Sequence, residues 1–337
     1  VFAPAGGFLT LPPAVATRVS VETGKGNFDF ALSEIGREPK AFLNGRATVQ
    51  TAPSVQKLTT EEYEDDEAAI ATLPGGGLAV AWVAYKERGD RVMVRTMQNG
   101  QWSAAEQVTP QPADIFRCSL AADAEGNLWA FWSERQDTRW VIRGSRRQGG
   151  AWQAPVMVSG YGSNTFHRAA SSQDGTVFVA WQSFRGAAGR AQSDIYARSF
   201  RGGQWSPEMR LSESPANDWE PDIAGGPGQT AYVAWDSYHK GDYDIFFRAM
   251  DGSRAQALQQ VTTSTRFQAH ASVAVDGEGR PWIAWDESGT NWGKDVGYLV
   301  TPAYGTPLHQ ERSLRLARWD GQKWTEPTQN LAERYHY

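Results

Sequence analysis

The sequence has few of the residues that form disulfides, zinc centres and membrane anchors. Its single cysteine, Cys118, excludes a disulfide within the chain, and five histidines do not favour a structural zinc site. Cys118 lies in the apolar run FRCSLAAD, which is typical of a buried small side chain. No apolar stretch approaches the roughly 20 residues that cross a bilayer. The net charge of −5 indicates no nucleic-acid-binding surface.

Helical periodicity is nearly absent, and so are a phosphate-cradling glycine loop and a serine nucleophile elbow. The sequence is instead rich in aromatic residues and glycine, with 15 Trp, 11 Tyr, 14 Phe and 34 Gly. Aromatic side chains fit half-buried pleated surfaces, and many glycines indicate many turns. The composition therefore favours an all-β protein.

A repeat of 49 to 54 residues dominates the chain. The repeated strand reads GGLAVAWVA, GNLWAFWSE, GTVFVAWQS, GQTAYVAWDS and GRPWIAWDE, and its equivalent tryptophans are Trp82, Trp132, Trp181, Trp235 and Trp285. A fixed period of this length indicates a propeller or a solenoid. Each unit divides into four strands with Asp-Gly or Gly-Gly turns, and the repeated strand is apolar on both faces, as expected between packed blades. The sequence predicts a β-propeller with five four-stranded blades between about residues 63 and 330.

The two ends of the chain are less regular. Residues 1–60 contain strand-like pieces and are predicted to form an N-terminal segment, and residues 61–337 the propeller repeats. Two ways of closing the ring into six or more blades stay open. Either the N-terminal segment contributes to a shared closing blade, or the chain is a fragment and sequence beyond it completes the ring.

Loop lengths distinguish the two ends of the propeller. The first-to-second and third-to-fourth turns are all short and share one end. The second-to-third loops lie at the other end, and the interval from the repeat tryptophan to an arginine of the third strand varies there from 11 to 33 residues. Length variation on one face of a rigid scaffold predicts a binding surface.

Polar and aromatic residues gather on this variable face, from the connections between blades and from the second-to-third loops. The candidate ligand-binding residues are Phe116, Arg117, His167, Arg168, Phe184, Arg185, Trp219, Glu220, Tyr238, His270, Asp286, Trp292, Lys294 and Asp295. The flat aromatic members would stack on a sugar ring.

The units AVDGEGRPWIAW and AADAEGNLWAFW resemble the repeats of sialidase-like and BNR-repeat propellers, and more loosely those of TolB-type propellers. The resemblance covers about residues 63–330 and implies an extracytoplasmic location, periplasmic or secreted, with a carbohydrate or protein partner. The sequence departs from the Asp-box of that superfamily, because Ala274 stands where Ser is expected and two residues separate Asp276 from Gly279. Sialidase activity is not favoured, because no Tyr–Glu nucleophile pair can be assigned.

The expected function is that of an extracytoplasmic binding module. Such a module could be the non-catalytic part of a larger secreted protein. The alternative is a carbohydrate-active enzyme, a polysaccharide lyase or glycoside hydrolase, at the channel mouth. A lyase needs a cation for the uronate carboxylate and a nearby base. Candidate catalytic residues are His167, Arg168, Tyr238, His239 and His270, and Arg117, Arg168 and Arg185 could clamp a carboxylate.

No cofactor is predicted, although one stretch is rich in carboxylates. DSYHKGDYD contains Asp236, Asp242 and Asp244, whose oxygens could bind Ca²⁺. The spacing is not that of an EF-hand loop, so a solvated polar turn is the preferred interpretation.

Overall fold

The computed structural model describes side chains for residues 57–59, 63–187, 190–238, 241–290 and 312–327. It also describes the backbone of residue 239 and of five strands between residues 7 and 51. The candidates Trp292, Lys294 and Asp295 lie outside the described residues. The chain divides into two compact units, Val1–Glu61 and Glu62–Tyr337.

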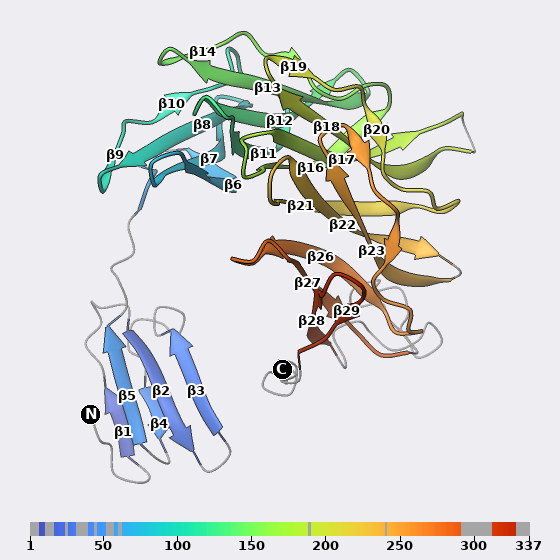
Figure 1. The fold of residues 1–337 in the computed structure, drawn as a ribbon. Coiled ribbons are helices and arrows are strands. Elements are labelled where there is room, and N and C mark those ends of the chain that lie inside the picture. Colours follow the sequence, from blue (N-terminus) through green and yellow to red (C-terminus); the bar gives the residue numbers. More distant parts are fainter. Residues whose placement is uncertain are drawn as a thin grey trace. The chain divides into compact units, whose positions relative to one another are not determined.

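The first unit contains five antiparallel strands in two small sheets (Figure 1). They are β1 (Gly7–Thr10), β2 (Thr17–Thr23), β3 (Gly26–Ala31), β4 (Lys40–Leu43) and β5 (Arg46–Thr51). β1 pairs with β4, and the second sheet has the order β3-β2-β5. In the described part of the chain, the strands of this unit pair with one another.

The second unit contains five antiparallel sheets, which confirm the predicted β-propeller blades (Figure 1). In each sheet three long strands follow in chain order from the channel outward, and two-residue strands at the outer edge pair with the third. Blade one has β6 (Glu64–Leu73), β7 (Gly77–Lys86), β8 (Gly89–Gln98), β9 (Gln101–Trp102) and β10 (Glu106–Gln107). Blade two has β11 (Ile115–Ala122), β12 (Leu128–Gln136), β13 (Arg139–Gln148), β14 (Ala151–Trp152) and β15 (Val156–Met157). Blade three has β16 (Ser163–Ser171), β17 (Val177–Arg185), β18 (Gln192–Arg201), β19 (Gln204–Trp205) and β20 (Met209–Arg210). Blade four has β21 (Asp218–Gly225), β22 (Thr230–His239), β23 (Asp242–Asp251), β24 (Arg254–Ala255) and β25 (Gln259–Gln260). Blade five has β26 (Gln268–Val275), β27 (Pro281–Glu287), β28 (Ser313–Trp319) and β29 (Trp324–Thr325).

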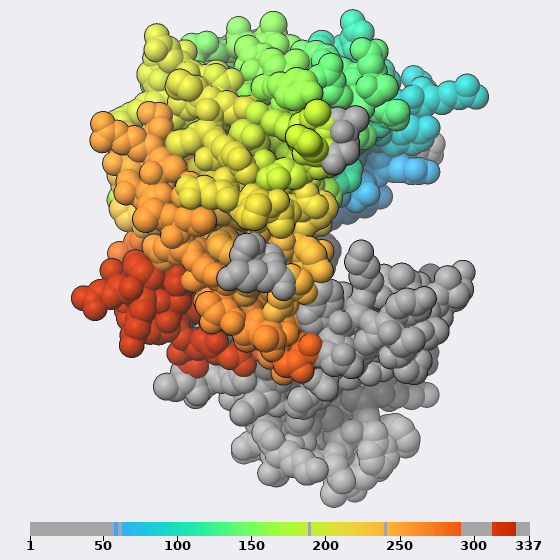
Figure 2. Space-filling view, turned by 90° about the vertical axis from the view of Figure 1, so that its right-hand side faces the viewer, coloured from blue at the N-terminus to red at the C-terminus, as the bar shows by residue number. Residues whose placement is uncertain are grey.

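Apolar cores lie between successive blades, because the second strand of a blade is covered on both faces. Trp132, Trp181 and Trp235 have no exposed surface. Trp132 packs with side chains of blade one, and Phe178 of blade three packs with Trp235 of blade four. In Figure 2 the blades follow one another as bands of colour from green through yellow to orange. Truncating such an aromatic core residue to alanine typically costs about 3–5 kcal/mol.

Aspartates close the short first-to-second turns. The Asp276 carboxylate accepts hydrogen bonds from the backbone N–H of Glu278 (2.9 Å) and of Arg280 (3.0 Å) and from Trp282 Nε1 (2.9 Å). The bond from Trp282 is the largest of the effects that hold the Asp276 pKa well below its usual value. Asp123 and Asp174 accept equivalent bonds in blades two and three. These aspartates are therefore part of the scaffold.

The second-to-third loops are shorter than the sequence predicts, but they vary in length as predicted, with the longest in blades three and five. β7 ends at Lys86 and β8 begins at Gly89, and the corresponding turns of blades two and four are equally tight. The longer connections are in blade three, between Arg185 and Gln192, and in blade five, between Glu287 and Ser313. The tryptophan-to-arginine interval overestimated the loops, because most of its residues belong to strands that extend to the end of the blade.

Cys118 is buried, as its apolar context predicts, and its Sγ donates to the Glu67 carbonyl (3.0 Å). Burial raises the pKa of this thiol to about 12, so it stays protonated and unreactive. No helix long and apolar enough to cross a membrane occurs in the described part of the chain.

Candidate functional site

Each innermost strand carries a β-bulge at the same height in the channel. Two residues of the bulged strand face one residue of the second strand, for example between Thr165 and Arg168 and between Ala269 and Ser272. Four residues in the bulges adopt positive φ although they are not glycine: Glu67 (48°), Phe166 (51°), Glu220 (42°) and His270 (59°). Such backbone costs of the order of 1–3 kcal/mol and is concentrated at functional sites. Bulges also redirect side chains, so the bulges mark this level of the channel as a candidate site.

A cavity of about 300 Å³ lies at this level. Its lining comes from the innermost strands of blades two to five and consists of Arg117, Arg168, Glu220, Pro221, Asp222, His270, Ala271 and Ser272. Four predicted ligand-binding residues, Arg117, Arg168, Glu220 and His270, are therefore brought together. A concave site with a few convergent polar groups is the usual form of a small-ligand site.

His270 is oriented by an acidic partner. Its Nδ1 lies 3.0 Å from Asp286 Oδ2, and Asp286 also accepts a hydrogen bond from Arg312. The bond with Asp286 raises the pKa of His270 above its ordinary value, and the same bond lowers the pKa of Asp286 to about 2. About half of the His270 side chain is exposed (53%). When Nδ1–H donates to Asp286, Nε2 carries the lone pair of a neutral imidazole and can accept a proton.

A buried carboxyl group supports the His270 bulge from the neighbouring blade. The backbone N–H of His270 donates to Asp236 Oδ1 (3.3 Å), and Asp236 is only 4% exposed. Burial raises the pKa of Asp236 to about 7. Blade four has a similar contact, in which the Glu220 N–H donates to Gln182 Oε1 (3.2 Å) of blade three. Asp236 and Gln182 each directly follow the repeat tryptophan of their blade.

The two arginines of the cavity are held differently. Arg117 forms an ion pair with Glu67 (3.1 Å), and its guanidinium carbon lies 5.5 Å and 5.2 Å from the ring centres of Phe116 and Phe166. Arg168 lies 3.9 Å from Asp222, and 42% of its side chain is exposed. Asp222 is also engaged by Ser272 Oγ (3.1 Å). Arg168 is therefore the more available cation for an anionic ligand.

His167 lies in the same innermost strand as Arg168 but not in the cavity lining. It is fully buried, and its Nδ1 lies 2.9 Å from Ser133 Oγ of blade two. Burial lowers the pKa of His167 to about 3, so the ring is neutral over the physiological range. Its Nε2 has no hydrogen-bond partner within the described residues. This position suits an interior packing role better than proton transfer to a ligand.

The remaining aromatic and arginine candidates do not line the cavity. Arg185 is held by Glu208 (2.5 Å) and Ser183 (2.6 Å) and stacks on Tyr196, with its guanidinium carbon 3.6 Å from the ring centre. The structure therefore does not assemble the three-arginine clamp, since only Arg117 and Arg168 meet.

Other candidates are spread over the same end of the blades. Phe184 is 52% exposed at the end of β17, and Tyr238 packs against Tyr243 with ring centres 5.0 Å apart. The indole Nε1 of Trp219 is buried without a hydrogen-bond partner in the described part of the chain. His239 ends β22, and its side chain is outside the described residues.

The three aspartates proposed for Ca²⁺ do not converge. Asp236 pairs with Ile245 across β22 and β23, whereas Asp244 pairs with Ser237. Because side chains alternate along a strand, Asp236 lies on the opposite face from Asp242 and Asp244. Asp244 bonds Gln260 Nε2 (2.9 Å). Within the described ranges, no group of three or more His, Cys, Asp or Glu side chains could hold a metal ion.

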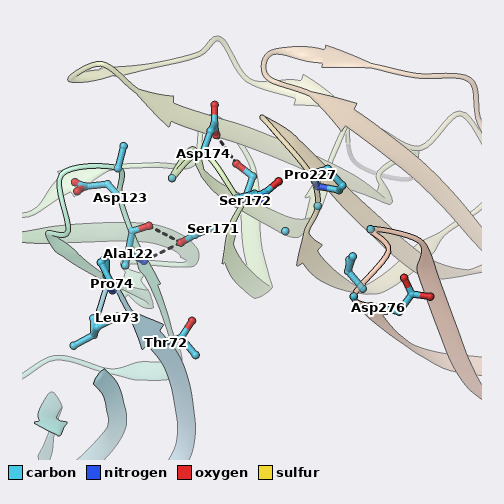
Figure 3. Close-up of a pocket in the computed structure, with 18 of the residues that line it drawn as sticks. Thr72, Leu73, Pro74, Ala122, Asp123, Ser171, Ser172, Asp174, Pro227 and Asp276 are labelled. Atoms are coloured by element: carbon cyan, nitrogen blue, oxygen red, sulfur yellow. Dashed lines mark hydrogen bonds between the residues drawn. The ribbon is translucent and has the colours of Figure 1, made fainter. Parts of the chain in front are cut away.

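A larger cavity of about 840 Å³ lies among the first-to-second turns (Figure 3). Its lining includes Asp123, Asp174 and Asp276, which are paired with Arg146, Arg201 and Arg280. Ser171 Oγ bonds the backbone N–H and C=O of Ala122 (2.9 and 2.6 Å), which joins blades two and three. Since its carboxylates are neutralised and occupied in turns, this end is structural.

Sequence reasoning missed Glu67, Phe166, Asp222 and Arg312. A signal for the first two was present, because one residue of each innermost strand lies 15 residues before the repeat tryptophan of its blade. These residues are Glu67, Arg117, Phe166, Glu220 and His270. An alignment of the repeats at this fixed offset would have found the bulge level. Arg312 follows the long blade-five insertion, so no fixed offset indicates it.

No family model and no curated protein matches the sequence. The structure is similar to that of a polysaccharide lyase of family PL25, an ulvan lyase, with a TM-score of 0.52 and 14% identity over 78% of this chain and 71% of that one. The same values hold for this lyase bound to -[GlcA(1-4)Rha3S]-. An α-L-arabinanase of Penicillium chrysogenum with arabinobiose has a TM-score of 0.45 and 12% identity over 79% and 82% of the two chains. At such identities the likeness to the lyase supports the β-propeller fold alone.

Proposed function

We propose that this protein is a carbohydrate-active enzyme that cleaves a uronate-containing polysaccharide by β-elimination at the channel-mouth cavity. The observation that carries the proposal is the convergence of His270, held by Asp286, with the two arginines Arg117 and Arg168 in one cavity. The arrangement supplies cations for a carboxylate and a base for a proton, the two requirements of a lyase. The similarity to an ulvan lyase agrees with this class.

In the proposed reaction, Arg168 and Arg117 bind the uronate carboxylate and make the neighbouring C–H more acidic. His270 Nε2 takes the proton from that carbon. The electron pair of the C–H bond forms a C=C bond, and the glycosidic C–O bond on the adjacent carbon breaks. The leaving oxygen takes a proton from water, so one product chain carries an unsaturated uronate and the other a new hydroxyl group.

The protonation state of His270 sets the pH range of this reaction. A base must be neutral, and the bond with Asp286 raises the pKa of His270 above its ordinary value of 6.5. The rate therefore increases as the pH rises through this elevated pKa, so the acidic limb of the pH profile lies above pH 6.5.

Glycoside hydrolysis is a second candidate, favoured by one observation. Asp236 has a pKa raised to about 7 by burial, as expected of a general acid, and the charge of Glu220 adds to this rise. Asp236, however, is buried and does not line the cavity. A hydrolase would need it to reach the glycosidic oxygen, so we prefer elimination.

A binding module without catalysis would use the same arginines but would not need the His270–Asp286 pair. The binding module would take a carbohydrate or a protein partner, whereas the substrate of either enzyme would be a polysaccharide too large to enter a cell. We therefore propose an extracytoplasmic location, periplasmic or secreted.

Incubation with ulvan, hyaluronan and alginate tests the proposal, with the ultraviolet absorbance of the unsaturated uronate as readout. We expect product from at least one polymer and a rate at least about a hundredfold lower for His270→Ala. We expect Arg168→Ala to lower kcat/KM by about tenfold to a hundredfold, because a charge-assisted bond to the carboxylate is lost.

Arg135→Ala is the matched control. Arg135 pairs with Asp114 (3.5 Å) in an exposed ion pair and does not line the cavity, so its loss should leave the rate unchanged. Equal losses in Arg135→Ala and Arg168→Ala would argue against a specific role of the cavity. Binding without product would favour the binding module.

A further inference from the structure

Two phenylalanine rings adjoin the cavity on the side of blades two and three. Phe116 and Phe166 meet edge to face, with ring centres 5.1 Å apart and an interplanar angle of 75°. Trp140 supports Phe116 from behind at 6.0 Å. Arg117 lies against both rings and also lines the cavity. The Arg117 side chain therefore connects the two rings with the cavity.

The backbone of Phe166 is unusual for a packing residue. Its φ of 51° places an aromatic residue in the left-handed region, where bulky residues are rare. The ring is nevertheless only partly buried, and it contacts the Phe116 ring and the Arg117 guanidinium. The same conformation occurs at Glu67, Glu220 and His270, so it belongs to the repeated bulge. In blade three the bulge places a phenylalanine ring beside Arg117, which lines the cavity.

The size of the cavity indicates why a neighbouring surface is needed. About 300 Å³ is at the lower end of ligand-sized cavities, so a polymer bound there must continue outside it. The C–H face of a pyranose ring is apolar and matches a flat aromatic ring. Arg117, between the cavity and the rings, is paired with Glu67, so Arg168 is the cation of the cavity that suits a polymer with carboxylates.

We propose that Phe166, supported by Phe116, forms an aromatic subsite that stacks a sugar ring of the polysaccharide next to the uronate in the cavity. This inference rests on the proposed function and names a binding determinant for the chain beyond the reacting residue. Long substrates would use the subsite, whereas a short fragment held in the cavity would not reach it.

Calorimetric binding of disaccharides and hexasaccharides from ulvan, hyaluronan and alginate tests the subsite. All measurements use the full chain with His270→Ala, so that no fragment is cleaved. Adding Phe166→Leu keeps an apolar side chain but removes the flat ring. We expect hexasaccharide binding to weaken by about tenfold, with little change for the disaccharide.

Two further variants separate stacking from packing. Phe166→Trp restores a flat ring and should recover hexasaccharide affinity, whereas a packing role would not tolerate the larger ring. Tyr161→Leu is the matched control, since Tyr161 is an exposed aromatic residue (65%) just before β16 that does not line the cavity and was not predicted to bind a ligand. If Phe166→Leu does not fold, Phe116→Leu is measured in its place with the same expected result.

The proposal is overturned if the Phe166→Leu variant binds hexasaccharide as its parent does, or if both fragment lengths weaken equally. Failure of the two proposals can be distinguished. If the wild type cleaves no polymer but Phe166→Leu still weakens only hexasaccharide binding, the subsite is supported and the catalytic assignment is wrong. No binding of any fragment by the parent would count against both.

Discussion

Two histidines from neighbouring parts of one channel differ because of their surroundings. His167 is enclosed between blades and faces a serine, so burial dominates and lowers the pKa of the ring to about 3. His270 is half-exposed and faces a carboxylate, so the hydrogen bond dominates and raises the pKa of the ring. The residue type alone made both of them candidates. Their environments make only His270 suitable as a base in water.

The buried His167 should make the fold sensitive to acid. The unfolded chain binds a proton near the ordinary pKa of 6.5, but the folded chain does not until about 3. The neutral, buried His167 therefore leaves the free energy of unfolding unchanged above about pH 6.5, and this free energy decreases as the pH falls toward 3. At about pH 5 the loss is about 2 kcal/mol. His167→Gln should therefore have a shallower decrease of the free energy of unfolding between about pH 7 and pH 5. Urea denaturation at several pH values measures this free energy. Parallel curves of stability against pH for the two proteins would contradict the prediction.

Asp286 should tune the pH profile of catalysis. Asp286→Asn removes the charge that raises the pKa of His270, so the acidic limb of the kcat/KM profile should move to lower pH. The maximal rate should also fall by about tenfold, because the ring without the neighbouring charge is a weaker base. A structural role alone would lower the rate at every pH without moving the limb.

At the scale of elements, the β-bulges of the innermost strands position the side chains of the site on a repeated scaffold. The repeat places one bulge residue 15 positions before each tryptophan, and in blades four and five the residue after the tryptophan of the preceding blade holds the bulge. The scaffold is therefore constant while the side chains at the bulges vary among Glu, Arg, Phe and His. Rigid support of this kind keeps a strained backbone in place.

The repeat tryptophans are fixed by more than apolar burial. Trp181 Nε1 donates to Asn164 Oδ1 (3.1 Å), whereas Trp129, in the same core between blades two and three, has a buried Nε1 without a partner in the described structure. Trp181→Phe should therefore cost about 1 kcal/mol more than Trp129→Phe in the free energy of unfolding. Chemical denaturation of both variants measures the difference. Equal costs would mean that the Trp181 hydrogen bond contributes nothing net.

At the scale of the whole molecule, the repeat period and the two-sided burial of one strand were enough to predict the blades. The position of Arg117, Arg168, Glu220 and His270 near the channel also followed from the repeat. The sequence could not indicate that Arg185 is occupied by Glu208, since that contact joins β17 to the loop before β20. Nor could it show that Asp236 is buried, because burial depends on the neighbouring blade.

Close approach of the innermost strands should limit which residues the turns accept. A Cβ on Gly225 would lie 1.8 Å from the Ser171 carbonyl oxygen of blade three, whereas a Cβ on Gly277 would meet nothing within 4 Å. Gly225→Ala should destabilise the fold by about 2 kcal/mol or more, and Gly277→Ala by less than about 0.5 kcal/mol. Thermal unfolding compares them. Similar melting temperatures would show that blades three and four are not packed this closely.

The most direct test of the central claim is the origin of the oxygen in the cleaved chain ends. The wild type is incubated with ulvan, hyaluronan or alginate in heavy-oxygen water, and the new ends are weighed by mass spectrometry. Elimination at the His270 cavity predicts unsaturated uronate ends without solvent oxygen, and their loss in His270→Ala. Saturated non-reducing ends, which form only when water is added across the broken bond, or unchanged products from His270→Ala, would contradict the account.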